Sequence, residues 1–334
     1  MDRRGFLITS TGTLAVIIAQ WATAPQAGGA VGGRRLSREV PDLFDARLDA
    51  LRHLDDHVGS GQNYDAATTE LRLITRLLKE ASYTEEVGRR LHGCAAEASR
   101  LAGWCAYDDG HHAAAERHFV AALRAAASAA DDTAGAIALA FWCNLRYTNG
   151  DSRGALDLVQ GALAADRRIT SSRVLAMLHA RQARAHAKAG EPTAAYLACD
   201  AAFAAYDRAG PPDQDLPSMY WINVGELHQM AASTALTLGE PRRALTHFDS
   251  AIGDDDPYDS DRETRGAAIY LARRAEAHLA LGELDAAVEV AQQVLHLMGG
   301  VESARGSLAL NELRHGLTGH RQVPLVADFL ELSR

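Results

Sequence analysis

Apolar residues recur along this chain at helical spacing, and single glycines interrupt the apolar segments at regular intervals. The motif Gly-x-x-x-x-Ala occurs five times, at Gly110/Ala115, Gly150/Ala155, Gly190/Ala195, Gly239/Ala244 and Gly282/Ala287. Each copy follows one helical pattern and opens another. The pattern therefore predicts five helical hairpins, each bending at its glycine.

The residues around each glycine fit such a bend. Glycine adopts the left-handed conformation that ends many helices, and an acidic residue after it favours the start of the next helix. Acidic residues directly follow four of the five glycines, as Asp151, Glu191, Glu240 and Glu283. A small residue also stands seven positions before each glycine, at Gly103, Cys143, Ala183, Ala232 and Ala275. Small residues on both helices predict close packing within each hairpin.

The order of small residue, glycine, alanine, bulky residue and alanine resembles the tetratricopeptide (TPR) motif over roughly residues 85 to 298. That resemblance implies an all-α fold, a right-handed superhelical solenoid of helical hairpins. The repeats are longer than the usual length of roughly 34 residues and lack the motif's early Trp and late Pro, so helix lengths and superhelical pitch stay open. We expect residues 41–334 to form the solenoid, with extra helices at 42–57 and 63–81 and a C-terminal cap at 303–316 and 323–332.

A narrower resemblance involves Tyr83-Thr84-Glu85, Leu101-Ala102-Gly103-Trp104 and the C-terminal Val323-Pro324-x-Val326. These segments are similar to the C-terminal, TPR-like halves of actinobacterial transcriptional regulators of the Xre type. In those regulators a helix-turn-helix domain precedes the TPR-like half, and we expect this chain to lack it. The resemblance implies a cytoplasmic protein connected with transcriptional or developmental regulation.

Residues 1–40 allow two interpretations. Arg3-Arg4-Gly5-Phe6-Leu7, followed by an apolar stretch at 14–19, resembles a twin-arginine export signal. The apolar stretch is too short to span a bilayer and would equally serve as a helix docked on the solenoid. The Xre-type regulators carry the same Arg-Arg-x-Phe-Leu segment at an internal junction, which favours the cytoplasm. The glycine-rich segment at 28–35 is predicted to be a flexible linker.

Composition and charge exclude several other classes of function. A hydrophobic content of 47% with 23% charged residues excludes disorder throughout, and a net charge of −9 disfavours direct binding to nucleic acid. The four cysteines form no C-x-x-C pair, so we interpret them as small buried apolar residues. No nucleotide-binding glycine loop, Gly-x-Ser-x-Gly elbow or His-Glu-x-x-His helix is present. We therefore expect no catalytic residues, cofactor or metal.

The first helix of each TPR hairpin forms the concave wall, so counting back six, three and two residues from each glycine predicts a binding surface. Its main residues are Trp104, Tyr107, Asn144, Tyr147, Arg184 and Lys188. This mixture suits an extended peptide or its carboxylate, held by the two cations, the amide and the aromatic rings. Alternatively, the aromatic residues pack between repeats and the cations are solvated or paired. The function expected is non-enzymatic binding of a partner protein or peptide; an exported scaffold protein is the alternative, and the oligomeric state stays open.

Overall fold

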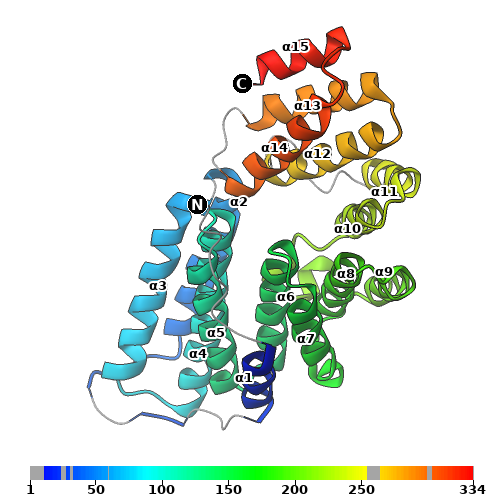
Figure 1. The fold of residues 1–334 in the computed structure, drawn as a ribbon. Helices are drawn as coiled ribbons and strands as arrows, with labels where there is room; N and C mark the ends of the chain where they lie inside the picture. The colour runs from blue at the N-terminus through cyan, green and yellow to red at the C-terminus, as the bar shows by residue number, and fades with distance from the viewer. Residues whose placement is uncertain are drawn as a thin grey trace.

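The computed structural model describes residues 11–23, 28–30, 33–58, 60–253, 264–298 and 303–333. These residues form an all-α fold (Figure 1), which confirms the predicted fold class. The helices are α1 (Thr11–Thr23), α2 (Val40–Val58), α3 (Ser60–Glu80), α4 (Glu85–Asp108), α5 (His112–Ala129), α6 (Asp132–Thr148), α7 (Ser152–Leu163), α8 (Ser172–Ala189), α9 (Pro192–Tyr206), α10 (Val224–Thr237), α11 (Pro241–Gly253), α12 (Thr264–Ala280), α13 (Leu284–Met298), α14 (Ala304–Thr318) and α15 (Pro324–Leu332).

The five motif glycines lie at hairpin bends, as predicted. They connect α4 to α5, α6 to α7, α8 to α9, α10 to α11 and α12 to α13, and all five have φ between 75° and 84°. Residues with a side chain rarely adopt this left-handed backbone conformation, which explains why glycine recurs at the bends. The alanine five positions later is completely buried in every hairpin. In the first hairpin, a Cβ added to Gly103 would lie 2.6 Å from Cε1 of Phe119, so the two helices need a glycine to approach this closely.

Successive hairpins pack against one another. The first helices α4, α6, α8, α10 and α12 contact each other in chain order, and the second helices α5 and α7 also contact the first helix of the following hairpin. The row bends round, so that α12 contacts α2 and the start of α14 reaches the end of α4 (Figure 1). The helices expected in front of the repeats and at the C-terminal end are present as α2, α3, α14 and α15.

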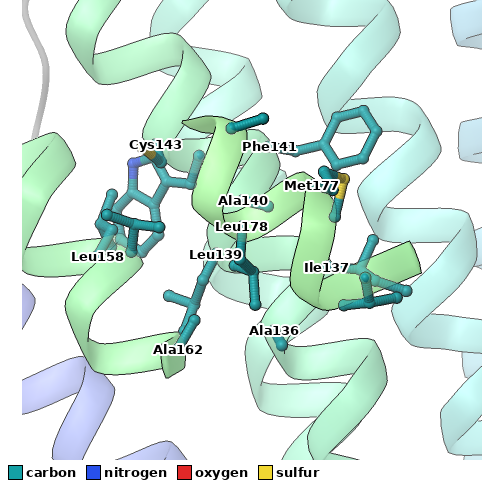
Figure 2. Packing of buried hydrophobic residues seen from close by; sticks show 14 of the residues in the cluster. Ala136, Ile137, Leu139, Ala140, Phe141, Cys143, Leu158, Ala162, Met177 and Leu178 are labelled. Atoms are coloured by element: carbon teal, nitrogen blue, oxygen red, sulfur yellow. The ribbon is translucent and has the colours of Figure 1, made fainter. Parts of the chain in front are cut away.

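The largest hydrophobic cluster lies around α6 (Figure 2). Trp142 is completely buried there, with Leu139 and Leu145 on the same helix and Met177 and Leu178 on α8. Helix α6 is buried on nearly all sides because α7, its partner in the same hairpin, and α5 of the preceding hairpin pack against it, while α4 and α8 flank it in the inner row. The middle of the chain therefore has one continuous hydrophobic core. The first helices packed on this core also carry polar residues that line a cavity.

Helix α1 docks on this core. Leu14 is completely buried and Trp21 is 6% exposed. Two glycines make room for the helix: a Cβ on Gly135 would lie 2.3 Å from the indole nitrogen of Trp21, and one on Gly161 would lie 2.7 Å from Cγ2 of Ile18. The apolar stretch thus packs as a helix of the fold, whereas the Arg3-Arg4 pair lies outside the described residues. None of the helices in the described ranges is both long enough and apolar enough to cross a membrane.

The segment expected as a linker contacts the folded chain. Ala30 exchanges backbone hydrogen bonds with Tyr83, at 3.2 and 3.0 Å, and Leu36 N–H donates to the carbonyl of Ser82 at 2.9 Å. These bonds join the described part of residues 28–36 to the turn before α4, instead of leaving it free.

The four cysteines are buried, as the sequence indicated, and none of them forms a disulfide within the described residues. Burial raises the pKa of Cys143 to about 12 and that of Cys199 to about 11. Only the thiolate reacts with disulfide reagents. We therefore expect the native protein at pH 8 to react with Ellman's reagent at least about tenfold more slowly than the unfolded chain. Time courses with and without denaturant measure this, and rapid labelling of the native protein would contradict it.

Candidate functional site

A cavity of about 230 Å³ lies inside the bend of the hairpin row. Residues from the first helices α4, α6, α8, α10 and α12 line it, together with residues from α2, α14 and the segment 218–221. The cavity is therefore built by the inner face of the repeats and closed by elements from both ends of the described chain.

Five of the six residues predicted for the wall line this cavity: Trp104, Tyr107, Asn144, Tyr147 and Arg184. The sixth, Lys188, is exposed and lies outside the lining. The structure thus brings the aromatic, amide and guanidinium groups together but leaves out the lysine.

The lining also includes a second position of every first helix, which the sequence analysis did not use. The residues nine positions before the five glycines are Leu101, Phe141, Arg181, Met230 and Arg273, and all five line the cavity. The cavity therefore extends along the first helices, from the positions near the bends to positions about two turns further from them. Counting back nine residues from each glycine would have found this second row.

Aromatic rings form the part of the cavity near α4 and α6. Trp104 meets Phe141 edge to face, with ring centroids 5.3 Å apart, and Phe141 meets Trp221 at 6.0 Å. The indole nitrogen of Trp104 donates to Oδ2 of Asp55 at 3.1 Å. The Tyr107 hydroxyl donates to Oγ1 of Thr148 at 3.0 Å, so this tyrosine both packs between hairpins and lines the cavity.

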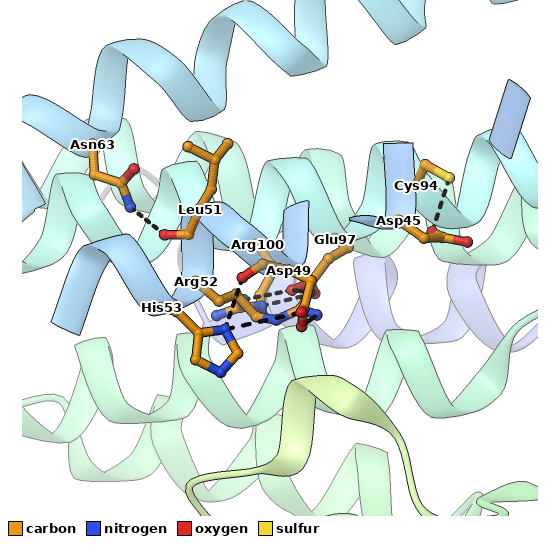
Figure 3. A network of polar contacts seen from close by, with 9 residues as sticks. All are labelled: Asp45, Asp49, Leu51, Arg52, His53, Asn63, Cys94, Glu97 and Arg100. Atoms are coloured by element: carbon orange, nitrogen blue, oxygen red, sulfur yellow. Dashed lines mark hydrogen bonds and ion pairs between the residues drawn. The ribbon is translucent and has the colours of Figure 1, made fainter. Parts of the chain in front are cut away.

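Two arginines beside the aromatic rings share one carboxylate, and one of them, Arg52, also pairs with Asp49 at 2.6 Å (Figure 3). Glu97 accepts from Arg52 at 2.8 Å and from Arg100 at 2.7 and 3.0 Å. Burial opposes ionisation of Glu97, but the charges of Arg100 and Arg52 outweigh it and lower the pKa of the carboxyl. Arg100 also lies over the ring of Phe141, at 4.6 Å from its centroid. These paired charges fix the wall and leave little net field there.

Arg184 lies in a different environment. Its side chain is 4% exposed and donates to the backbone carbonyl of Ser233 and, at 3.0 Å, to Oγ1 of Thr237. Within the described part of the chain, no carboxylate forms an ion pair with it. Burial lowers the pKa of Arg184 to about 10, and the positive charge of Arg273 contributes to the shift. Both guanidinium groups line the cavity, which gives this end a positive field.

The Arg181 guanidinium, one turn from Arg184, is held by polar and acidic neighbours. It donates to the Tyr147 hydroxyl at 2.9 Å and lies over Trp221 at 5.9 Å. Despite burial, the nearby oxygens of Tyr147, Tyr270 and Glu226 raise its pKa. Arg181 is thus part of the fixed wall.

Residues distant in sequence close the cavity. Arg305 of α14 donates to Oδ1 of Asp108 at 3.3 Å and lies over the rings of Trp104 and Tyr107, at 4.7 and 5.2 Å. On the other side, Tyr220 donates to Asp56 and stacks on His53 with centroids 4.6 Å apart. These contacts cover the opening between the two ends of the row.

We expect Arg305→Ala to open the cavity. The change removes the link between α14 and α4, and it costs about 1–3 kcal/mol because the carboxylate of Asp108 is completely buried and loses one of its partners. Acrylamide quenching reports the opening, since Trp104 and Trp221 are half-buried whereas Trp142 and Trp21 are buried. Quenching should increase in Arg305→Ala and stay unchanged in the control Arg314→Ala on the same helix. Equal quenching in wild type and Arg305→Ala would contradict the closing role.

The described residues offer little to a metal ion, because no group of three or more His, Cys, Asp or Glu side chains there is placed to hold one. Comparisons with family models, curated proteins and solved structures find no match to this chain. The site is therefore interpreted from its own geometry.

Proposed function

We propose that this protein is a non-enzymatic regulatory protein of the TPR type, whose hairpins form a right-handed solenoid that binds a short peptide or a segment of a partner protein. The observation that carries the proposal is the repeated register. Equivalent positions on five successive first helices contribute to a single cavity. Repeat proteins bind their partners on extended concave surfaces of this kind, to which successive repeats contribute.

The chemistry of the lining supports a peptide as the ligand. Trp104 and Phe141 offer flat apolar area, Asn144 offers an amide for backbone hydrogen bonds, and the arginines offer donors to carboxylates. Neighbouring side chains already hold many of these groups in place, which lowers the cost of ordering them on binding. A cavity of about 230 Å³ fits a chain end or a few side chains, so a short segment is favoured over a large surface.

The proposal includes a cytoplasmic role connected with transcription through a partner. Its support is the similarity to the TPR-like halves of Xre-type regulators, together with a net charge of −9, which opposes direct contact with nucleic acid. The docking of α1 also favours the interpretation of the first apolar stretch as part of the folded protein, because Leu14 and Trp21 belong to its core.

Panning a library of short random peptides against the immobilised protein tests the proposal. Calorimetry should then show that the enriched peptides bind the protein in solution. Asn144→Ala should lower their affinity at least about tenfold, the loss typical of a buried polar group left unpaired. Leu197→Ala, which changes a 65% exposed residue of α9, should bind like the wild type. The proposal fails if no peptide is enriched or if both variants bind equally well.

A further inference from the structure

We infer that the part of the cavity between α8, α10 and α12 is an anion subsite, where Arg184, Arg273 and the hydroxyl of Ser233 hold a carboxylate or phosphate group of the ligand. This inference rests on the proposed function, since it names the chemistry that one end of the ligand needs.

The first observation is a buried charge held by neutral groups alone. Arg184 is buried, and its printed hydrogen bonds go to a backbone carbonyl and to the hydroxyl of Thr237. A buried guanidinium ordinarily pairs with a carboxylate, because desolvation of the ion is otherwise uncompensated. An arginine kept without an anionic partner inside a cavity is suited to receive that partner from a ligand.

The second observation is an unpartnered hydroxyl beside it. Ser233 is 3% exposed, lines the cavity, and its Oγ has no hydrogen-bond partner in the described residues. A serine within a helix commonly donates to the carbonyl four residues earlier, as Thr234 and Thr237 do in the same helix. The Ser233 hydroxyl makes no such bond, so it is available to donate to an anion in the cavity.

The third observation is a second cation that lines the same cavity. Arg273 is half-buried on α12 and forms no ion pair within the described ranges. Glu312 lines the cavity and Glu276 lies close by on α12, and their charges offset part of the positive field. Neither acid forms an ion pair with Arg184 or Arg273, so both guanidinium groups keep donors for a ligand. Planar guanidinium forks bind carboxylate and phosphate oxygens well.

The aromatic rings on α4 and α6 add a second requirement. An anion held at Arg184 and Arg273 places the rest of the ligand toward Trp104 and Phe141, which suit an apolar or aromatic group. The ligand class is therefore an organic anion with an apolar part. A peptide that ends in an apolar residue belongs to this class when its terminal carboxylate is free.

Three probes test the subsite: 3-phenylpropionate, its neutral amide, and inorganic phosphate, each at constant ionic strength. Ligands that bind the native state raise the melting temperature. We expect the acid to raise it and the amide to have no effect. Arg273→Gln should lower the affinity for 3-phenylpropionate at least about tenfold, which corresponds to the loss of one charge-assisted contact. Arg274→Gln is the matched control, because this neighbouring arginine instead pairs with Asp249 at 2.7 Å.

Stability without any probe gives an independent result. Removing one of two like charges relieves repulsion, so ligand-free Arg273→Gln should melt no lower than the wild type. Ser233→Ala keeps both charges and should lower the affinity for 3-phenylpropionate by a smaller factor than Arg273→Gln does. A preference for phosphate over the acid supports the subsite and identifies a phosphate ligand.

Several results would overturn the subsite. These are equal shifts with acid and amide, an unchanged affinity for the acid in Arg273→Gln, or no shift with either anion. If library peptides bind while neither anion raises the melting temperature, the subsite is refuted and the proposed function stands. If no peptide binds while the acid shift persists, the proposed function fails and the subsite stands as a small-anion site.

Discussion

Replacing Glu116 by alanine is expected to lower the free energy of unfolding by about 3–5 kcal/mol, the range for breaking a buried ion pair from one side. Glu116 of α5 pairs with Arg146 of α6, and the two side chains are 1% and 3% exposed. Without the acid, the buried guanidinium keeps Asp151 at 2.7 Å, but that carboxylate is 30% exposed and already caps α7. The pair therefore joins the first hairpin to the second inside the core.

Urea unfolding followed by circular dichroism measures the loss. The control is Glu85→Ala, which breaks the surface pair with Arg89 at 2.6 Å, where the acid is 58% exposed. An exposed pair one helical turn apart contributes only about 0.3–0.5 kcal/mol, so the control should unfold almost like the wild type. Similar midpoints for both variants would show that the buried pair does not stabilise the stack.

Local chemistry made the hairpins predictable. A glycine with positive φ, a buried alanine five residues later and a small residue seven residues earlier all act within a single hairpin, so one sequence contains the whole signal. The same counting placed Trp104, Asn144 and Arg184 on the inner face, where the structure has them. Repeat geometry transfers between copies because each hairpin packs mainly on its neighbours.

The closure of the cavity was not predictable in this way, because it joins residues far apart in the sequence. Asp108 and Lys188 stand at equivalent positions, two residues before their glycines. Asp108 is completely buried beneath Arg305 of α14, whereas Lys188 is exposed. The repeat pattern does not say which hairpin the C-terminal helix covers. The prediction from the repeat pattern therefore placed Lys188 in the binding surface and missed the role of Arg305.

The other large effect is expected at the N-terminal helix. Trp21→Ala should lower the free energy of unfolding by about 3 kcal/mol, the lower end of the range for a buried tryptophan, because α1 can undock and limit the loss. Trp21 is 6% exposed and fills the space over Gly135. Val16→Ala is the control, since this residue of the same helix is 53% exposed and should change stability by less than about 0.5 kcal/mol.

Circular dichroism in urea is the appropriate measurement, because it does not depend on the fluorescence of the tryptophan removed. Unchanged unfolding of Trp21→Ala would mean that α1 adds nothing to the fold, as expected of a leader segment. If the loss is observed, a chain that begins at Gly28 should be destabilised at least as much, because it lacks Leu14 and Ile18 as well. Cleavage after the apolar stretch would then release a protein with a lower free energy of unfolding, which favours the interpretation of α1 as part of the functional protein.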